Sequence, residues 1–176
     1  MHSPSICIVC RDPSRKQQAE MLSQQAGLPV LEHSSKDYEL LLVFDRDRVF
    51  LFDASLDTAI DVDFVEGALA HRQQFGGGRG QPIARAVGLK HGKNPSVLDI
   101  TAGLARDAYV LASLGCTLTL VEQSPVLFTL VEDGVRRGMA DAAATSVLRN
   151  FMNLVNADSV LYMEHMDAET RPDVIY

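Results

Sequence analysis

Apolar residues in the second half of the chain follow two alternating spacings. Short runs of strand-forming residues lie at four places: 97–100, 116–121, 152–157 and 172–176. Stripes at helical spacing lie between them, at 104–114, 124–138 and, more weakly, 142–150. Strands that alternate with helices predict βαβ units, so we expect an α/β fold with an open parallel sheet.

The first sixty residues show a pattern of their own. A strand-like run at 5–10 precedes a helix predicted over 12–26, and Gly27 is suited to end that helix. Two apolar runs, 39–44 and 49–52, flank a polar tetrapeptide and predict a β-hairpin. Residues 1–60 therefore read as a small N-terminal α/β subdomain, and they contain no recognisable catalytic constellation.

A glycine-rich connector, residues 61–95, separates this subdomain from the parallel sheet of 96–176. It combines a predicted helix at 64–75, a glycine-arginine run at 75–80 and a short helix at 82–87. Consecutive glycines before a helix let a phosphate approach the backbone closely. A flexible hinge between the two parts explains the same glycines equally well, so both readings stay open.

Acidic residues stand where the predicted parallel strands end. Asp99 ends the first strand, Glu122 ends the second, and Asp158 with Ser159 follows the third. Ligands of open α/β sheets bind at this edge, and an acid at the end of the second strand can accept hydrogen bonds from ribose hydroxyls. Asp158 could accept from an adenine amine or could cap a helix. The pattern predicts a nucleoside cofactor.

The turn after the first strand favours a cationic cofactor over a dinucleotide. It holds one glycine, Gly103, where dinucleotide sites usually have three. Asp99 and Asp107 also place negative charge where a pyrophosphate would sit. S-adenosylmethionine carries a sulfonium and an ammonium group and no phosphate, so it is the expected cofactor. The plain alternative is an ordinary α/β turn that binds nothing.

Charge is distributed unevenly along the chain. The 176 residues carry a net charge of −7, yet the span from 67 to 98 has no acidic residue. This span holds five cations: Arg72, Arg79, Arg85, Lys90 and Lys93. Such a basic island can bind a polyanion even on an acidic protein, so Arg72, Arg79 and Arg85 are candidate RNA contacts.

Several classes of protein are disfavoured by the sequence. No apolar run approaches the roughly 20 residues of a membrane helix, and the N-terminus lacks a signal-peptide pattern, which indicates a cytoplasmic protein without membrane contact. Cys7 and Cys10 lie on a predicted strand and would point to opposite faces, against a redox or zinc pair. The five histidines are scattered, so we expect no metal.

The chain resembles the RsmJ family of bacterial methyltransferases, which use S-adenosylmethionine to modify a guanine N2 amine in 16S ribosomal RNA of the small subunit. The resemblance is strong from about 61 to 176. Five segments carry it: 64–72, Phe-Val-Glu-Gly-Ala-Leu-Ala-His-Arg; 75–80, Phe-Gly-Gly-Gly-Arg-Gly; 98–107, Leu-Asp-Ile-Thr-Ala-Gly-Leu-Ala-Arg-Asp; 112–116, Ala-Ser-Leu-Gly-Cys; and 156–159, Asn-Ala-Asp-Ser. It implies a Rossmann-like class I methyltransferase sheet.

The resemblance also implies which residues hold the cofactor. They are Arg106, Asp107, Glu122, Gln123, Asp158 and Ser159. Gln123 and Asp158 depart from the family, which can carry arginine and serine there. Family members continue past the position of Tyr176 into an Asp-Pro-Met-aromatic-Pro segment that resembles a target-amine loop. We therefore name no catalytic residue and expect a truncated sheet and a chain that is inactive by itself.

Three functions follow, in order of preference. The first is methylation of a guanine N2 amine in 16S ribosomal RNA, either free or in the small subunit. The second is a nicotinamide-dependent oxidoreductase on a similar sheet, which the missing glycines disfavour. The third is a non-catalytic RNA-binding fragment that uses the basic island.

Overall fold

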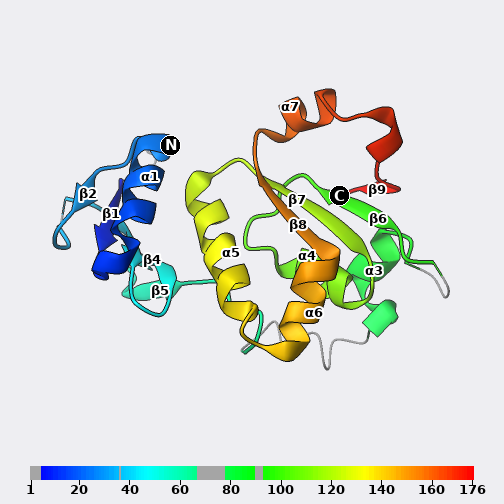
Figure 1. Cartoon of the computed structure of the whole chain (residues 1–176), viewed down its shortest axis with the longest axis horizontal. Coiled ribbons are helices and arrows are strands. Elements are labelled where there is room, and N and C mark those ends of the chain that lie inside the picture. The colour runs from blue at the N-terminus through cyan, green and yellow to red at the C-terminus, as the bar shows by residue number, and fades with distance from the viewer. Residues whose placement is uncertain (1–4, 36, 67–77, 90–92) are drawn as a thin grey trace.

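The computed structural model describes residues 5–35, 37–66, 78–89 and 93–176. Its strands form two separate sheets, one from the N-terminal third of the chain and one from the C-terminal half. Figure 1 shows the first sheet beside helix α5 (Pro125–Gly138), which stands between it and the second sheet. The fold is therefore α/β, as the sequence predicts.

The N-terminal sheet has five strands in the order β2-β1-β3-β4-β5. Strand β1 pairs in parallel with β2 and β3, whereas β4 and β5 are antiparallel additions. The bounds are β1 Ile6–Cys10, β2 Val30–Leu31, β3 Leu40–Phe44, β4 Val49–Asp53 and β5 Thr58–Ile60. The predicted hairpin is confirmed as β3 and β4, with the Asp45 N–H donating to the Arg48 carbonyl at 3.0 Å.

Helix α1 (Lys16–Ala26) follows a short 3₁₀ turn at Pro13–Arg15 and packs on one face of this sheet. The Asp12 side chain caps the turn by accepting from the Ser14 N–H, and Gly27 ends α1 in the left-handed conformation at φ 66°, as predicted. Cys7 is buried in the cluster on the other face, and Cys10 packs against the main core. The two thiols lie on opposite faces, as the strand spacing predicts.

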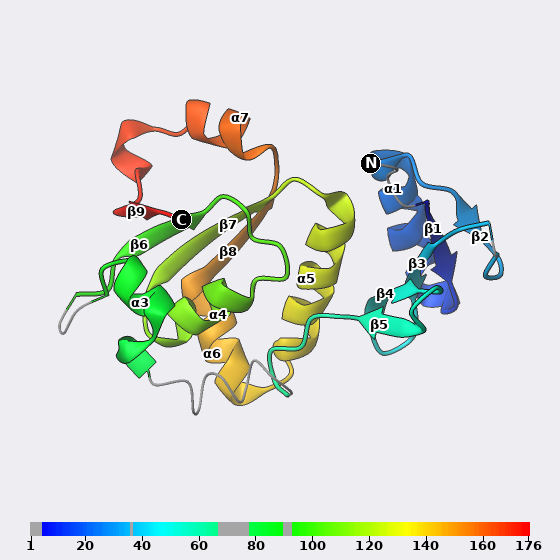
Figure 2. The same ribbon diagram turned by 180° about the vertical axis from the view of Figure 1, so that it is seen from behind.

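The second sheet is entirely parallel, with strand order β8-β7-β6-β9. Its strands are β6 Ser96–Asp99, β7 Thr117–Glu122, β8 Met152–Asn156 and β9 Val174–Ile175. The helices are α3 Pro82–Ala86, α4 Arg106–Ser113, α5, α6 Ala142–Phe151 and α7 Ser159–Glu164. Helix α6 contacts both α4 and α5, and all three contact the sheet. Helix α7 follows β8 and contacts β7 (Figure 2).

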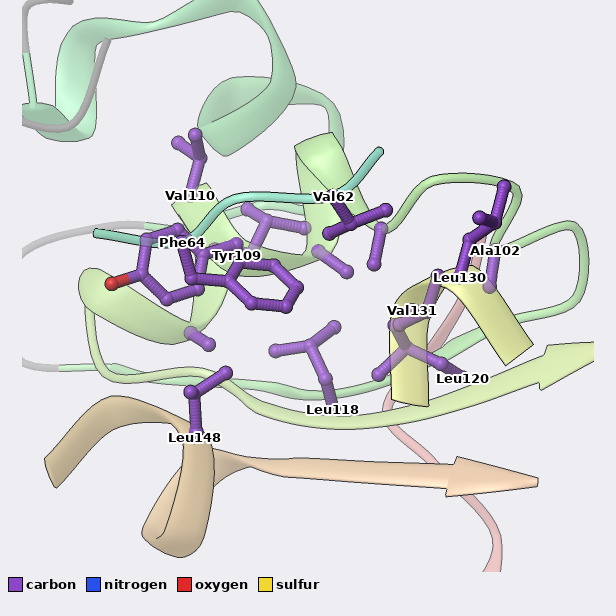
Figure 3. Packing of buried hydrophobic residues seen from close by; sticks show 14 of the residues in the cluster. Val62, Phe64, Ala102, Tyr109, Val110, Leu118, Leu120, Leu130, Val131 and Leu148 are labelled. Carbon is purple, nitrogen blue, oxygen red and sulfur yellow. The ribbon is translucent and has the colours of Figure 1, made fainter. Parts of the chain in front are cut away.

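Aromatic and aliphatic side chains fill the space between these helices and the sheet. Phe64, at the end of the described connector, packs its ring 4.8 Å from that of Tyr109 on α4, and both are almost completely buried. Figure 3 shows the pair above Leu118 and Leu148. Burying large aromatic side chains contributes roughly 1.5–3 kcal/mol each, so Phe64 anchors the start of the connector in the core.

Asp133 on α5 ties the two sheets together. Its carboxylate is 1% exposed and accepts hydrogen bonds from the buried Arg15 guanidinium at 3.0 Å and from the Val49 N–H at 2.9 Å. Arg136 and Arg137 of the same helix donate to it as well, at 2.9 and 3.0 Å. Burial alone would raise the pKa of Asp133, but the Val49 N–H and the arginines outweigh it and hold this pKa below the usual value.

The structure corrects several predicted boundaries. The helix expected from residue 104 begins at Arg106, because Gly103 and Ala105 adopt left-handed backbone conformations at φ 53° and 56°. In the helix expected at 64–75, residues 64–66 form a bend, and the remainder lies outside the described residues. Strand β5 and helix α7 were not expected, since both are short and lack a clear apolar period.

Replacing Asp133 by Asn should destabilise the fold strongly. The new amide would turn an NH₂ group toward donors that now share a carboxylate, and Arg15 would stay buried beside it. We expect the free energy of unfolding, measured by urea denaturation at pH 7, to fall by about 3–5 kcal/mol. Because the folded-state pKa of Asp133 is lowered, the stabilisation it gives is lost as pH falls through that pKa, and the two curves should converge in acid.

Asp45→Asn is the matched control, because Asp45 pairs at 3.5 Å with Arg11 and both side chains are about half exposed. Such a pair is worth at most about 1 kcal/mol. An Asp133→Asn variant no less stable than this control would contradict the assigned role.

Candidate functional site

The turn between β6 and α4 brings the first predicted acid to the edge of the sheet. Asp99 ends β6, is 3% exposed and accepts a hydrogen bond from the Thr101 N–H at 3.0 Å. The Ala102 N–H donates to the Val121 carbonyl of β7, which holds the turn against the neighbouring strand. Asp99 therefore lies at the carboxyl edge of the sheet, as predicted.

Two left-handed residues shape the rest of this turn. Gly103 tolerates its φ of 53°, but Ala105, at φ 56°, has a side chain that makes this conformation cost about 1–2 kcal/mol. Ala105 occupies the N-cap position of α4 and supplies no side-chain oxygen to the helix N–H groups. The first turn of α4 thus opens toward the sheet edge with Arg106 and Asp107 at its start.

Glu122 at the end of β7 holds the turn from the other side. One carboxylate oxygen accepts from the Gly103 N–H at 2.8 Å, and the other accepts from the Ser124 N–H at 2.7 Å. Glu122 is 8% exposed, so these bonds replace lost hydration. A carboxylate has about four acceptor positions, so the two backbone bonds leave acceptor capacity for a ligand hydroxyl.

A pocket of about 420 Å³ lies at this edge, within the roughly 300–1,000 Å³ range of small-molecule sites. Its lining combines two acids, one arginine, one phenol and three other small or apolar residues: Asp99, Thr101, Ala102, Leu104, Arg106, Asp107 and Tyr176. The structure thus brings together three of the predicted cofactor residues, Asp99, Arg106 and Asp107. Gly103 and Glu122 support the wall through their mutual hydrogen bond.

The pocket has an acidic field around Asp99. Burial raises the pKa of Asp99, the Thr101 N–H opposes that effect, and the negative charges of Asp107 and Glu122 raise this pKa further. Within the described residues no cation forms an ion pair with Asp99. A buried acid whose pKa is raised by neighbouring acids is stabilised by a positively charged ligand and disfavours a phosphate.

The remaining predicted cofactor residues lie along the same edge, outside the pocket lining. Asp158 caps α7 by accepting from the Val160 and Leu161 N–H groups, so its N-cap role is present. Gln123 donates to the second Asp158 oxygen at 3.3 Å, and Ser159 is the first residue of α7. A cofactor role for Gln123, Asp158 and Ser159 stays a prediction.

The candidate RNA contacts lie elsewhere. Arg72 falls outside the described residues, and Arg85 is exposed on α3. Arg79 donates to the Asn94 side chain at 2.6 Å and to the Leu114 carbonyl at the C-terminal end of α4. Leu114 lies at the opposite end of α4 from Arg106 and Asp107, which line the pocket. The position of Arg79 suits a structural role besides any RNA contact.

Sequence reasoning did not name four of the pocket residues as site residues: Thr101, which donates a hydrogen bond to Asp99, and Ala102, Leu104 and Tyr176, which form part of the wall. The Tyr176 hydroxyl donates to an Asp107 carboxylate oxygen at 3.0 Å. The signal available was its position at the end of the last predicted strand, 172–176, at the same edge as the acids. Across the described residues, no cluster of three metal-ligating side chains occurs, and no helix is long and apolar enough to span a membrane.

Comparisons with known proteins identify a family. The model of a family described as "Putative SAM-dependent methyltransferase" matches residues 21–176. The chain is 46% identical over 171 residues to "Ribosomal RNA small subunit methyltransferase J" of Aeromonas hydrophila subsp. hydrophila. It is 45% identical over 172 residues to the protein of the same name from Aeromonas salmonicida. Each alignment covers 96% of this chain and 66% of the relative, so the chain spans just under two thirds of their length.

A solved structure gives the same answer for the fold. The crystal structure of a SAM-dependent methyltransferase from Neisseria gonorrhoeae superposes with a TM-score of 0.78 at 29% sequence identity. The superposition covers 96% of this chain and 67% of that chain. The Rossmann-like arrangement of the parallel sheet, with its preceding α/β part, is therefore shared.

Replacing Asp99 by Asn should stabilise the ligand-free protein. Because the folded-state pKa of Asp99 is raised, its ionisation opposes folding as pH rises above the ordinary aspartate value of about 3.9. We expect a melting temperature about 2–4 °C higher than wild type at pH 7, the shift that 1 kcal/mol gives in a chain of this size. Calorimetry should show the difference vanish below pH 4.

The control is Asp167→Asn, since Asp167 is exposed and its side chain makes no capping bond. A lower melting temperature for Asp99→Asn than for this control at pH 7 would contradict the prediction, because it would mean that the Asp99 carboxylate stabilises the ligand-free fold.

Proposed function

Since the chain belongs to this family of SAM-dependent methyltransferases, we propose that it forms the cofactor-binding part of an enzyme that methylates a guanine N2 amine in 16S ribosomal RNA. The pocket beside Asp99 and Asp107 is the observation that carries the cofactor half of this proposal. The names of the Aeromonas relatives carry the RNA half.

The donor set of the pocket suits S-adenosylmethionine. The cofactor supplies a methyl group on a positively charged sulfur and carries a second positive charge on its ammonium group. Asp99 and Asp107 would face this cationic end, because the negative charge of Asp107 raises the pKa of Asp99 and a cation would relieve that repulsion. Glu122 would accept from the ribose hydroxyls with the positions that Gly103 and Ser124 leave open.

The chain's contribution to methyl transfer is positioning. The turn at 101–105 is fixed by Val121, Glu122 and its own left-handed residues, so the pocket needs little rearrangement on binding. Holding two reactants in line at about 3 Å supplies much of the rate in such reactions. Residues that would hold the guanine amine belong to the segment that follows Tyr176 in the family, so no catalytic role is assigned here.

The oxidoreductase alternative meets an electrostatic obstacle. A nicotinamide dinucleotide places its pyrophosphate at the first helix N-terminus, where this chain has Asp107 and a neighbouring buried Asp99. The single glycine of the turn also lacks the close approach that a dinucleotide turn needs. A non-catalytic RNA-binding role would leave the acidic pocket without a purpose.

Calorimetric titration tests the cofactor site directly. Wild-type protein should bind S-adenosylmethionine and should show no heat with NAD. Glu122→Ala should weaken binding by roughly 10–100-fold, because it removes the ribose acceptor and frees the turn at Gly103, which together are worth about 1.4–2.7 kcal/mol. Asp167→Asn should bind as wild type does. Binding of NAD alone would contradict the proposal.

Electrophoretic mobility shift with a 16S RNA fragment tests the basic island. An Arg72→Ala/Arg85→Ala variant should bind more weakly and should lower the slope of log K against log salt by about 1 for each phosphate that it no longer neutralises. Arg149→Ala, which removes an exposed cation on α6 outside the island, is the matched control. Equal weakening in both variants would remove the island from the RNA surface.

A further inference from the structure

Tyr176 is held firmly by the parallel sheet. Its backbone N–H donates to the Leu98 carbonyl at 2.8 Å, and its carbonyl accepts from the Ile100 N–H at 3.1 Å. These two bonds continue the pairing of β9 with β6 beyond the end of both strands. The backbone of Tyr176 is therefore held beside Asp99, which lies between its two hydrogen-bond partners, Leu98 and Ile100.

The side chain of Tyr176 reaches across the pocket mouth from β9 to α4. Its hydroxyl donates to Asp107 at 3.0 Å, and the ring forms part of the pocket wall. A tyrosine loses little side-chain entropy when fixed, because only two torsions are ordered. The hydrogen bond links the strand that follows α7 to the first turn of α4, which are 69 positions apart in sequence.

The chemistry of this donor matters for a cationic ligand. Asp107 lies close enough to Asp99 for its negative charge to raise the pKa of Asp99. A lysine or arginine would hold Asp107 but would cancel its charge. A phenol is neutral, so its hydrogen bond holds the carboxylate without itself cancelling the charge.

We propose that Tyr176 is a positioning residue that fixes Asp107 against the ammonium-bearing end of the cofactor. This inference rests on the proposed function, because it takes S-adenosylmethionine as the ligand. It assigns the wall formed by Tyr176 and Asp107 to recognition of the amino acid end, and the Glu122 side to the nucleoside end.

The test is binding of three ligands to Tyr176→Phe by calorimetry at pH 7.5. S-adenosylmethionine and S-adenosylhomocysteine carry the amino acid end, whereas 5′-methylthioadenosine has the nucleoside and sulfur without it. Loss of one hydrogen bond to a carboxylate should weaken the first two by roughly 3–10-fold. Binding of 5′-methylthioadenosine should stay within twofold of wild type.

Tyr38→Phe is the matched control, since Tyr38 packs on the far face of the N-terminal sheet. Equal weakening of all three ligands by Tyr176→Phe would indicate a general structural role and would overturn the inference. Unchanged binding of all three would overturn it too. If the wild-type protein binds none of them, the proposed function fails and the inference fails with it.

Discussion

The buried carboxylate of Asp133 is the interaction on which the arrangement of the molecule depends. It gathers donors from three separate segments: Arg15 before α1, the Val49 backbone at the start of β4, and two arginines of its own helix. A charge taken out of water costs several kcal/mol unless every partner is present. Folding of the N-terminal sheet and its attachment to α5 are therefore coupled, because each completes the shell of the same side chain.

Helix α5 connects Asp133 to the sheet edge at which the cofactor is proposed to bind. Its N-cap is Ser124, whose N–H is bound by the Glu122 carboxylate that also holds Gly103. Asp133 lies two to three turns further along the same helix of 14 residues, which spans about 21 Å. A second link runs from Gln25 of α1 to Asn156, which in turn binds the Glu122 carbonyl. The N-terminal part thus contacts the edge where the nucleoside is proposed to bind.

Sequence periodicity was enough to predict the order of the longer strands and helices, because these elements have a clear apolar period, whereas the short β5 and α7 do not. It also placed Asp99 and Glu122 correctly, since strand ends of a parallel sheet share one edge. It could not foresee that Ala105 would adopt a left-handed conformation, which depends on contacts of the turn with β7. It could not distinguish Asp133 from other polar residues of α5, because its partners lie 118 and 84 positions away.

The acidity of the pocket makes sense only as a balance between stability and binding. Asp99 is buried beside two other acids, and its raised pKa records a free-energy cost to the ligand-free fold. A chain selected for stability alone would place an asparagine there, as this side chain keeps the acceptor for Thr101 without the charge. This free-energy cost would be offset when the proposed cationic cofactor binds, because the negative charges around Asp99 would then attract it. Tyr176 is consistent with this balance, because its neutral hydroxyl donates a hydrogen bond to Asp107 and does not itself cancel the carboxylate charge.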